Sequence, residues 1–243
     1  MLNQAKHRMQ MINILLKLYK DSESARVLGF KGGTAAYLFY DLPRFSVDLD
    51  FDLLVETDKI KRNELIKKMT GIFQKDFEIR EQSDKRFTLF WLLSYKKGDR
   101  QLKIEVSKRK SDSKFEDKPF YGVNIPVMKL QDAMANKLMA LADRKKFANR
   151  DVFDAWYFLS KLEAEEINYE LIKERLGLMP KKLYQKILKR INKKRGESVL
   201  QGMGELLTEK QKSWVKNKLL SELNQLIRIH LDSFLQRRIL CKS

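Results

Sequence analysis

Hydrophobic residues change their spacing about halfway along this chain of 243 residues. In the first half, short segments alternate apolar and polar residues, which is typical of strands with one buried face. After residue 127, apolar residues recur every three or four positions to the end, and this pattern predicts helices. We therefore expect an α+β protein with a small mixed β-sheet domain at residues 1–127 and a helical domain at residues 128–243.

The strands predicted in the first half are 26–30, 47–51, 77–80, 87–95, 102–107 and 121–127. The helices predicted there are 2–19, 35–40 and 59–74, and residues 116–119 are predicted to form a loop. The helices predicted in the second half are 130–142, 150–162, 169–176, 181–192, 197–207 and 210–238.

A pair of glycines stands between the first predicted strand and the helix after it. At Gly32 and Gly33 the backbone can approach a ligand closely, and the free N–H groups of a helix N-terminus favour an anion. Most glycine pairs are simple turns. The pair indicates a phosphate site only in combination with the acidic residues of the next strand.

That strand carries acidic residues at every second position. Asp48 and Asp50 share one face, opposite the apolar residues, and Mg²⁺ usually takes one or two carboxylates together with substrate phosphates. Glu105, in the alternating segment 102–107, would join them if the two strands are neighbours. Without such partners, each acid is more often part of a solvated edge. Asp52 lies more than ~13 Å along the strand from Asp48, so we expect it at the surface.

These residues resemble the AbiEii/AbiGii (MenT-like) toxin family of the DNA polymerase β nucleotidyltransferase superfamily. The similarity runs from about Lys31 to Asp154, and nothing beyond Tyr169 can be matched. The segments that carry it are Lys31-Gly32-Gly33-Thr34-Ala35, Arg44-Phe45-Ser46-x-Asp48-x-Asp50-Phe51, Lys103-Ile104-Glu105-Val106-Ser107, Asp132-x-x-x-x-Lys137 with Arg144, and Arg150-Asp151-Val152-Phe153-Asp154.

The resemblance implies a metal-dependent enzyme that transfers a nucleotidyl group from a nucleoside triphosphate (NTP) to an acceptor and releases pyrophosphate. The catalytic residues that it implies are Asp48, Asp50, Glu105, Lys137 and Asp151. Asp48, Asp50 and Glu105 would bind Mg²⁺ or Mn²⁺, and Glu105 could instead act as the base. The nucleotide-binding residues that it implies are Lys31, Gly32, Gly33, Thr34, Arg44, Ser46, Lys137 and Arg150.

Taken without the resemblance, the later motifs also fit ordinary helix surfaces. Lys137 and Arg144 are seven residues apart, hence on one helix face, where they could meet a triphosphate. Asn149 is a candidate N-cap for the next helix. Asp151 would then favour the positive end of the helix dipole, and Arg150 would form a surface pair with Asp154 worth only ~0.3–0.5 kcal/mol. The residues alone favour this simpler interpretation.

The formal net charge of +18 favours a polyanionic partner such as RNA. The family includes toxins of toxin–antitoxin pairs, and some members extend the 3′ end of tRNA, so we expect a tRNA acceptor and a cognate antitoxin. One basic cluster comprises Lys189, Arg190, Lys193 and Lys194. Solvated helix faces would explain the same charge. An antibiotic-type nucleotidyltransferase of small molecules and a non-catalytic nucleic-acid-binding module remain as alternatives, although a basic surplus suits a cationic acceptor poorly.

The remaining features of the sequence point to the cytoplasm. Cys241 is the single cysteine, so neither an intramolecular disulfide nor a cysteine zinc site can form, in keeping with a reducing compartment. No apolar run approaches the ~20 residues of a membrane span, and we expect neither a signal peptide nor membrane association. His7 and His230 stand outside any metal-ligand spacing, and we expect structural roles for both.

Overall fold

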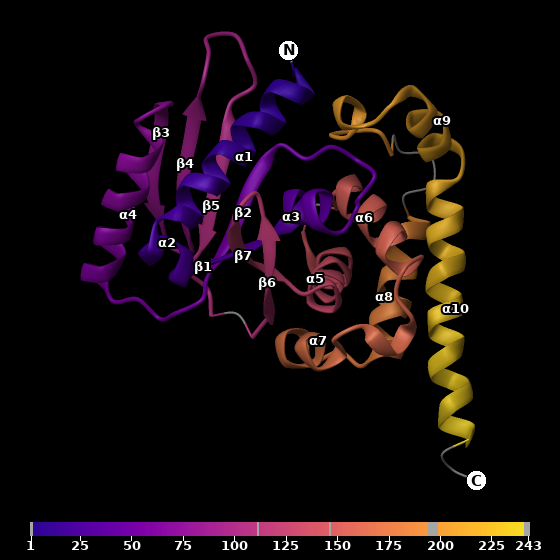
Figure 1. Cartoon of the computed structure of the whole chain (residues 1–243). Coiled ribbons are helices and arrows are strands. Elements are labelled where there is room, and N and C mark those ends of the chain that lie inside the picture. Colours follow the sequence, from indigo (N-terminus) through magenta and orange to yellow (C-terminus); the bar gives the residue numbers. More distant parts are fainter. Residues whose placement is uncertain (1, 111, 146, 194–198, 241–243) are drawn as a thin grey trace. The chain divides into compact units, whose positions relative to one another are not determined.

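The computed structural model of the chain describes residues 2–110, 112–145, 147–193 and 199–240, with residues 235–240 described by their backbone alone. The chain divides into two compact units, Met1–Lys129 and Leu130–Ser243. The first unit combines a sheet with helices, and the second is helical (Figure 1). This is the mixed class that the change in hydrophobic spacing predicts.

The described residues of the first unit form a seven-stranded sheet with the order β3-β4-β5-β2-β1-β7-β6. Strand β2 pairs with β5 and β1 pairs with β7 in parallel, whereas all other neighbours are antiparallel. The strands are β1 (Leu28–Lys31), β2 (Asp48–Leu53), β3 (Glu78–Lys85), β4 (Thr88–Ser94), β5 (Leu102–Ser107), β6 (Phe115–Phe120) and β7 (Val123–Met128).

Helices of the first unit pack on one face of this sheet. They are α1 (Gln4–Lys20), α2 (Ser22–Val27), α3 (Gly32–Phe39) and α4 (Lys59–Phe73). Phe73 of α4 meets Trp91 of β4 edge to face, with ring centroids 5.7 Å apart. Tyr19 of α1 lies 6.4 Å from the ring of Phe51 in β2. The rings place α1 and α4 over the same apolar face of the sheet.

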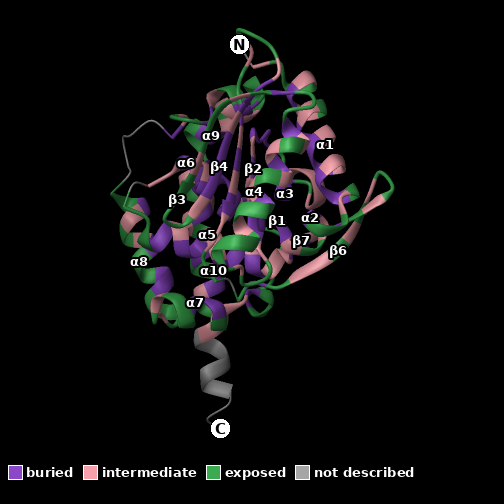
Figure 2. Cartoon of the chain, turned by 90° about the vertical axis from the view of Figure 1, so that its left-hand side faces the viewer, coloured by how far each residue is buried: buried purple, intermediate pink, exposed green. Residues whose placement is uncertain are grey.

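The buried face of the sheet fixes where the polar residues point. Leu49 and Phe51 of β2 and Ile104 of β5 are fully buried, and the two strands are central in the sheet order. Figure 2 shows buried residues along the strands around β2 and β4. Burial of each such side chain contributes about 1.5–3 kcal/mol. Since neighbouring side chains in a strand point to opposite faces, Asp48, Asp50, Lys103 and Glu105 are all held on the other face.

The second unit consists of helices around its own apolar core. Helix α5 packs against α6, α7 and α8, and α10 runs along α6 and α8. Its core includes the fully buried side chains of Leu138, Tyr184, Ile187, Leu223 and Ile227. The helices are α5 (Leu130–Asp143), α6 (Asn149–Leu159), α7 (Tyr169–Leu176), α8 (Pro180–Asn192), α9 (Glu209–Asn217) and α10 (Leu219–Leu240), with short 3₁₀ turns at Ala164–Glu166 and Gly204–Leu206.

Two predictions in the first unit are wrong. Residues 116–119 form the middle of strand β6 rather than a loop, because an edge strand that pairs only with β7 can be polar and can contain Pro119. Residues 26–27, predicted as strand, end helix α2, whose first turn is capped when Asp21 accepts a hydrogen bond from the Ser24 amide at 2.9 Å.

The predicted helices at 197–207 and 210–238 also need correction. Of the first segment, residues 197–198 lie outside the described residues, and the rest is turns plus the short 3₁₀ turn at Gly204–Leu206. Gly202 has a φ of 76°, in the left-handed region where a helix cannot continue. The second segment is two helices, because α9 ends at Asn217 and α10 begins at Leu219.

Candidate active site

The glycine turn joins β1 to α3 and touches residues of β2. Gly32 has a φ of 82°, and a Cβ added there would lie 2.5 Å from Asp50 Oδ2. A Cβ on Gly33 would lie 2.9 Å from both Arg44 Nη2 and Ser46 Oγ. Glycine is therefore required at Gly32 by its backbone conformation and its contact with Asp50, whereas a Cβ at Gly33 would meet the ends of the Arg44 and Ser46 side chains. The turn brings Asp50, Arg44 and Ser46 together around one stretch of backbone.

The side chains that flank the turn are largely buried. Thr34 is fully buried, and its hydroxyl donates to the backbone carbonyl of Asp48, which ties the start of α3 to β2. Arg44 and Ser46 are each 4% exposed, and Arg44 Nη1 donates to the carbonyl of Phe45 at 3.0 Å. The backbone N–H groups of the turn, rather than the Thr34 hydroxyl, are thus the natural donors to an anion.

Strand pairing assembles three carboxylates, which we call the acid cluster: Asp48, Asp50 and Glu105. Strands β2 and β5 are parallel neighbours, as the site prediction requires, and their register sets Asp50 opposite Glu105 and Asp48 opposite Lys103. The Lys103 ammonium lies 3.3 Å from Asp48 Oδ2 and 3.4 Å from Glu105 Oε2. Sequence reasoning places Lys103 on this face but assigns it no role. The signal was its position two residues before Glu105.

The pKa of Asp50 reflects the surroundings of the acid cluster. Desolvation, together with the smaller effects of the neighbouring charges of Asp48 and Glu105, raises the pKa of Asp50 to about 6, although Lys103 and Lys31 oppose this rise. An acid so perturbed by burial and by like charges lies where a cation would be stabilised.

Asp52 is buried, contrary to the surface position expected for it. It is 2% exposed and forms an ion pair with Lys31 of the adjacent strand β1. Its partner Lys31 lies next to the glycine turn. Lys31 is the N-cap residue of α3 and does not cap it with its side chain, which is bonded to Asp52 instead.

The later motifs form an ion-pair network within the second unit. Lys137 Nζ of α5 lies 2.9 Å from Asp151 Oδ1 and 2.8 Å from Asp154 Oδ2 of α6. Arg144 Nη1 lies 2.8 Å from Asp151 Oδ2. Asp154, expected in a surface pair with Arg150, is instead fully buried. Lys137 and Arg144 do share a helix face, as their spacing predicts, and that face meets Asp151.

Other residues of these motifs form hydrogen bonds near the starts of α5 and α6. Asn149 is the first residue of α6 rather than its N-cap, and its amide donates to the carbonyl of Gln201 at 3.2 Å. Asp132 is 2% exposed and accepts a hydrogen bond from Asn168 at 2.7 Å. Arg150 lies half-buried in the first turn of α6.

Both histidines are held in the protein interior. His7 is fully buried, with Nε2 2.9 Å from the carbonyl of Val47 and Nδ1 3.0 Å from the Tyr95 hydroxyl. His230 is 5% exposed, and its Nε2 lies 3.0 Å from the carbonyl of Leu159. Structural roles fit both residues. Cys241 and Lys194 lie outside the described residues.

The chemistry of the acid cluster suits a hard divalent ion. In the described part of the chain, no three Asp, Glu, His or Cys side chains are arranged as a ready-made metal site. Mg²⁺, however, usually binds through one or two carboxylates and completes its shell with water and substrate phosphates. Asp48 and Asp50, with a phosphate-type turn beside them, fit that mode of binding. Glu105 lies next to these two acids, but its carboxylate also pairs with the Lys103 ammonium.

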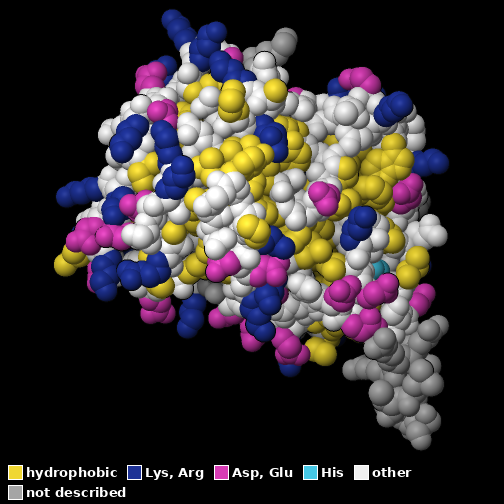
Figure 3. Space-filling model, in the orientation of Figure 1, with side chains coloured by type: hydrophobic (Ala, Val, Ile, Leu, Met, Phe, Trp, Pro, Cys, Tyr) yellow, Lys and Arg dark blue, Asp and Glu magenta, His cyan; other side chains and the backbone are white. Residues whose placement is uncertain are grey.

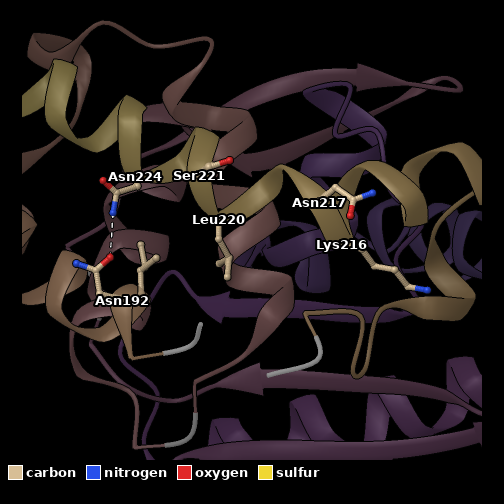
Figure 4. A pocket seen from close by; sticks show the side chains of 7 residues that line it. Asn192, Lys216, Asn217, Leu220, Ser221 and Asn224 are labelled. Carbon is tan, nitrogen blue, oxygen red and sulfur yellow. Dashed lines mark hydrogen bonds between the residues drawn. The ribbon is translucent and has the colours of Figure 1, made fainter. Parts of the chain in front are cut away.

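A polar groove of about 420 Å³ lies in the second unit where α8 ends and α9 gives way to α10 (Figure 4). Among the described residues, those that line it are not acidic: Ile191, Asn192, Lys216, Asn217, Leu220, Ser221 and Asn224. Asn224 Nδ2 donates to Asn192 Oδ1 at 3.2 Å across the groove. Among the cations of the predicted basic cluster, Arg190 bonds the carbonyl of Arg144 and lies over the Phe147 ring.

Positive side chains are not restricted to this groove. On the face of the molecule in Figure 3, Lys and Arg side chains are dispersed with Asp and Glu side chains between them. None of the helices within the described ranges is both long enough and apolar enough to cross a membrane.

A family model described as "Nucleotidyl transferase AbiEii toxin, Type IV TA system" matches residues 14–227. The match therefore includes the glycine turn, the acid cluster, the ion-pair network and most of the helical unit. It extends well beyond the segment 31–154 on which the resemblance rests. No curated protein matches the sequence.

Solved structures show the same fold at low sequence identity. JHP933 from Helicobacter pylori is 19% identical with a TM-score of 0.64, over 98% of this chain and 96% of that one. A candidate nucleotidyltransferase from H. pylori is 19% identical with a TM-score of 0.59, over 96% of each chain. An antigenic nucleotidyltransferase-like protein from Paracoccidioides brasiliensis is 14% identical with a TM-score of 0.50, over 81% of this chain and 93% of that one.

Proposed function

This chain belongs to the AbiEii family of nucleotidyltransferase toxins of type IV toxin–antitoxin systems, and we propose that it transfers a nucleotidyl group from an NTP to the 3′ end of an RNA, with tRNA as the acceptor. The observation that carries the proposal is the juxtaposition of the Gly32–Gly33 turn with Asp50. A phosphate-binding turn and metal-type carboxylates would then act on one triphosphate. The net charge of +18 supports a polyanionic acceptor.

The residues of the first unit would have separate roles. The backbone N–H groups at Gly32, Gly33 and Thr34 would bind the triphosphate, with Arg44 and Ser46 supporting the turn and Lys31 adding positive charge beside it. Asp48 and Asp50 would hold Mg²⁺ or Mn²⁺. Such an ion, when bound, neutralises charge on the phosphates and on the displaced oxygen.

Glu105 would act on the acceptor. The 3′ hydroxyl oxygen forms a bond to the α-phosphorus while the bond from that phosphorus to the oxygen bridging to the β-phosphate breaks, and pyrophosphate leaves. The hydroxyl proton passes to the Glu105 carboxylate, which lies directly across from Asp50 in the sheet register. Glu105 would alternatively complete the metal shell.

Lys137, Arg150 and Asp151 would contribute from the second unit. In this proposal Lys137 and Arg150 contact nucleotide phosphate, and Asp151 orients Lys137 through the 2.9 Å ion pair. The family also supports an antitoxin as a partner of this chain.

The test is incubation of the purified chain with total RNA, Mg²⁺ and each α-labelled NTP in turn. We expect one or more nucleotides to label RNA in the tRNA size range, and periodate oxidation of the RNA 3′ ends to abolish labelling. If no RNA is labelled while small cationic acceptors are, the acceptor is a small molecule and the RNA proposal is wrong.

A further inference from the structure

Lys103 places a cation among the carboxylates that would bind the metal. Its Nζ lies within 3.4 Å of carboxylate oxygens of both Asp48 and Glu105. The strand register fixes this position, since Lys103 stands directly opposite Asp48 in the parallel β2–β5 pair. Its two neighbours in β5, Leu102 and Ile104, are fully buried, which holds the backbone at this point. The ammonium therefore belongs to the acid cluster and not to the open surface.

We propose that Lys103 is a resident counter-ion that opposes divalent metal binding until the nucleotide arrives. This inference rests on the proposed metal-dependent function. An ammonium at this distance repels a dication held on Asp48 and cancels part of the negative charge that would attract it. An NTP brings several negative charges, which offset that repulsion and offer the ammonium a phosphate partner. Metal and nucleotide would consequently bind together.

The arrangement differs from that of an ordinary surface ion pair. Exposed pairs join one cation to one acid and contribute little. Lys103 instead bridges two acids, while the third, Asp50, lies opposite Glu105 and next to the glycine turn.

Binding of Mn²⁺ to the nucleotide-free protein tests this role directly, by calorimetry or by electron paramagnetic resonance of the free ion. We expect Lys103→Met to bind Mn²⁺ at least about tenfold more tightly than wild type, which corresponds to about 1.4 kcal/mol. Lys103→Arg keeps the charge and should remain as weak as wild type. Lys108→Met is the matched control, because Lys108 comes directly after the same strand but pairs with Asp84, and its affinity should be unchanged.

Thermal unfolding gives a second readout that does not depend on activity. Removing Lys103 takes away the ammonium that bridges Asp48 and Glu105, so Mn²⁺ should raise the melting temperature of Lys103→Met more than that of wild type. Adding Asp48→Asn to Lys103→Met should abolish the gain in affinity. Mn²⁺ affinity in Lys103→Met equal to or weaker than wild type would overturn the inference, as would a gain that survives Asp48→Asn.

Two different experimental outcomes distinguish an error in the role of Lys103 from an error in the proposed function. If wild type binds Mn²⁺ together with a non-hydrolysable NTP and transfers label, while Lys103→Met gains no affinity, only the role of Lys103 is wrong. If wild type binds no divalent ion even with nucleotide, metal dependence itself is wrong and the role of Lys103 falls with it.

Discussion

Gly32 is a position of the candidate site where a side chain is poorly tolerated. Gly32→Ala would force a Cβ within 2.5 Å of the Asp50 carboxylate at a backbone φ of 82°. We expect loss of nucleotide binding and destabilisation of about 1–3 kcal/mol. Gly71→Ala is the control, because Gly71 lies inside α4 with nothing within 4 Å of the added Cβ, and it should stabilise by about 0.5–1 kcal/mol. Equal unfolding free energies for the two variants would contradict the close contact.

Asp50 gives the site a pH-dependent cost in stability. Burial and the neighbouring acids raise its pKa from 3.8 to about 6, so between these values the folded chain holds a proton that the unfolded chain has lost. The contribution of Asp50 to the unfolding free energy therefore falls as pH rises from about 4 to about 6. Metal-free Asp50→Asn should be more stable than metal-free wild type at neutral pH, by about 1–3 kcal/mol.

Chemical denaturation of both proteins across this pH range checks the sign. The stability difference should be small near pH 4, increase toward pH 6 and then level off. An Asn variant less stable than wild type at neutral pH would show that ionised Asp50 is stabilised by the fold, contrary to its surroundings.

At the scale of elements, strand alternation could be predicted from the sequence because each strand has one buried face. The alternating apolar residues of 47–51 and 102–107 are buried as expected, and Asp50 and Glu105 meet because β2 and β5 are neighbours. Pairing between strands is a tertiary property, so the burial of Asp52 against Lys31 and the contact of Lys103 with Asp48 could not be derived from one strand alone.

The wrong predictions of secondary structure have similar physical causes. Strand β6 lies at the edge of the sheet, so its residues are not forced to alternate between apolar and polar side chains. Residues 199–207 have helical composition, but glycines at 202 and 204 accompany turns instead. Helices α5 and α6 lie close to their predicted bounds, but Asp154, expected at the surface with Arg150, is buried and pairs with Lys137 of α5. The 0% exposure of Asp154 depends on how the two helices pack.

The contact between α5 and α6 makes Lys137 important for stability as well as for the proposed chemistry. Its ammonium forms ion pairs with both Asp151 and the buried Asp154. A cation that only bound phosphate would contribute little to the stability of the fold, and Lys137 does not fit that description. Lys137→Met removes the ammonium that lies 2.8 Å from the buried Asp154 carboxylate. We expect it to lower the unfolding free energy by about 3–5 kcal/mol.

A double variant separates the structural role from a catalytic one. Lys137→Met combined with Asp154→Asn also removes the buried carboxylate charge and should recover much of the lost stability. If the recovered protein still lacks transfer activity, Lys137 acts on the nucleotide too. Full activity in the stable double variant would limit Lys137 to holding the helices together.

At the scale of the whole molecule, the charge of +18 predicts strongly salt-dependent RNA binding. The logarithm of affinity should fall with the logarithm of salt concentration, with a slope of about −0.7 to −0.9 per phosphate contacted. Exposed Lys189 and Lys193 and the groove residue Lys216 are the candidate contacts in the second unit. Their replacement by Gln should flatten the slope, whereas transfer to a minimal acceptor should be unchanged.

The control removes the same charge from the first unit. Lys59, Lys61 and Lys67 are exposed on α4, and their joint replacement by Gln should leave the slope nearly as in wild type. Equal flattening by both triple variants would mean that RNA responds only to net charge. An unchanged slope in the first variant would mean that Lys189, Lys193 and Lys216 are only solvated surface residues.

The central claim is that Asp48 and Asp50 form the metal-dependent centre of a nucleotidyltransferase that acts on RNA. Its most direct test is the rate of labelled nucleotide transfer by Asp48→Asn at saturating Mg²⁺, with Asp84→Asn as the control, since Asp84 pairs with Lys108 and Arg62 away from the acid cluster. We expect kcat/KM to fall about a thousandfold or more, roughly 4 kcal/mol, in the first variant, with its melting temperature kept. Asp84→Asn should transfer label as wild type does, and transfer near the wild-type rate by Asp48→Asn would contradict the claim.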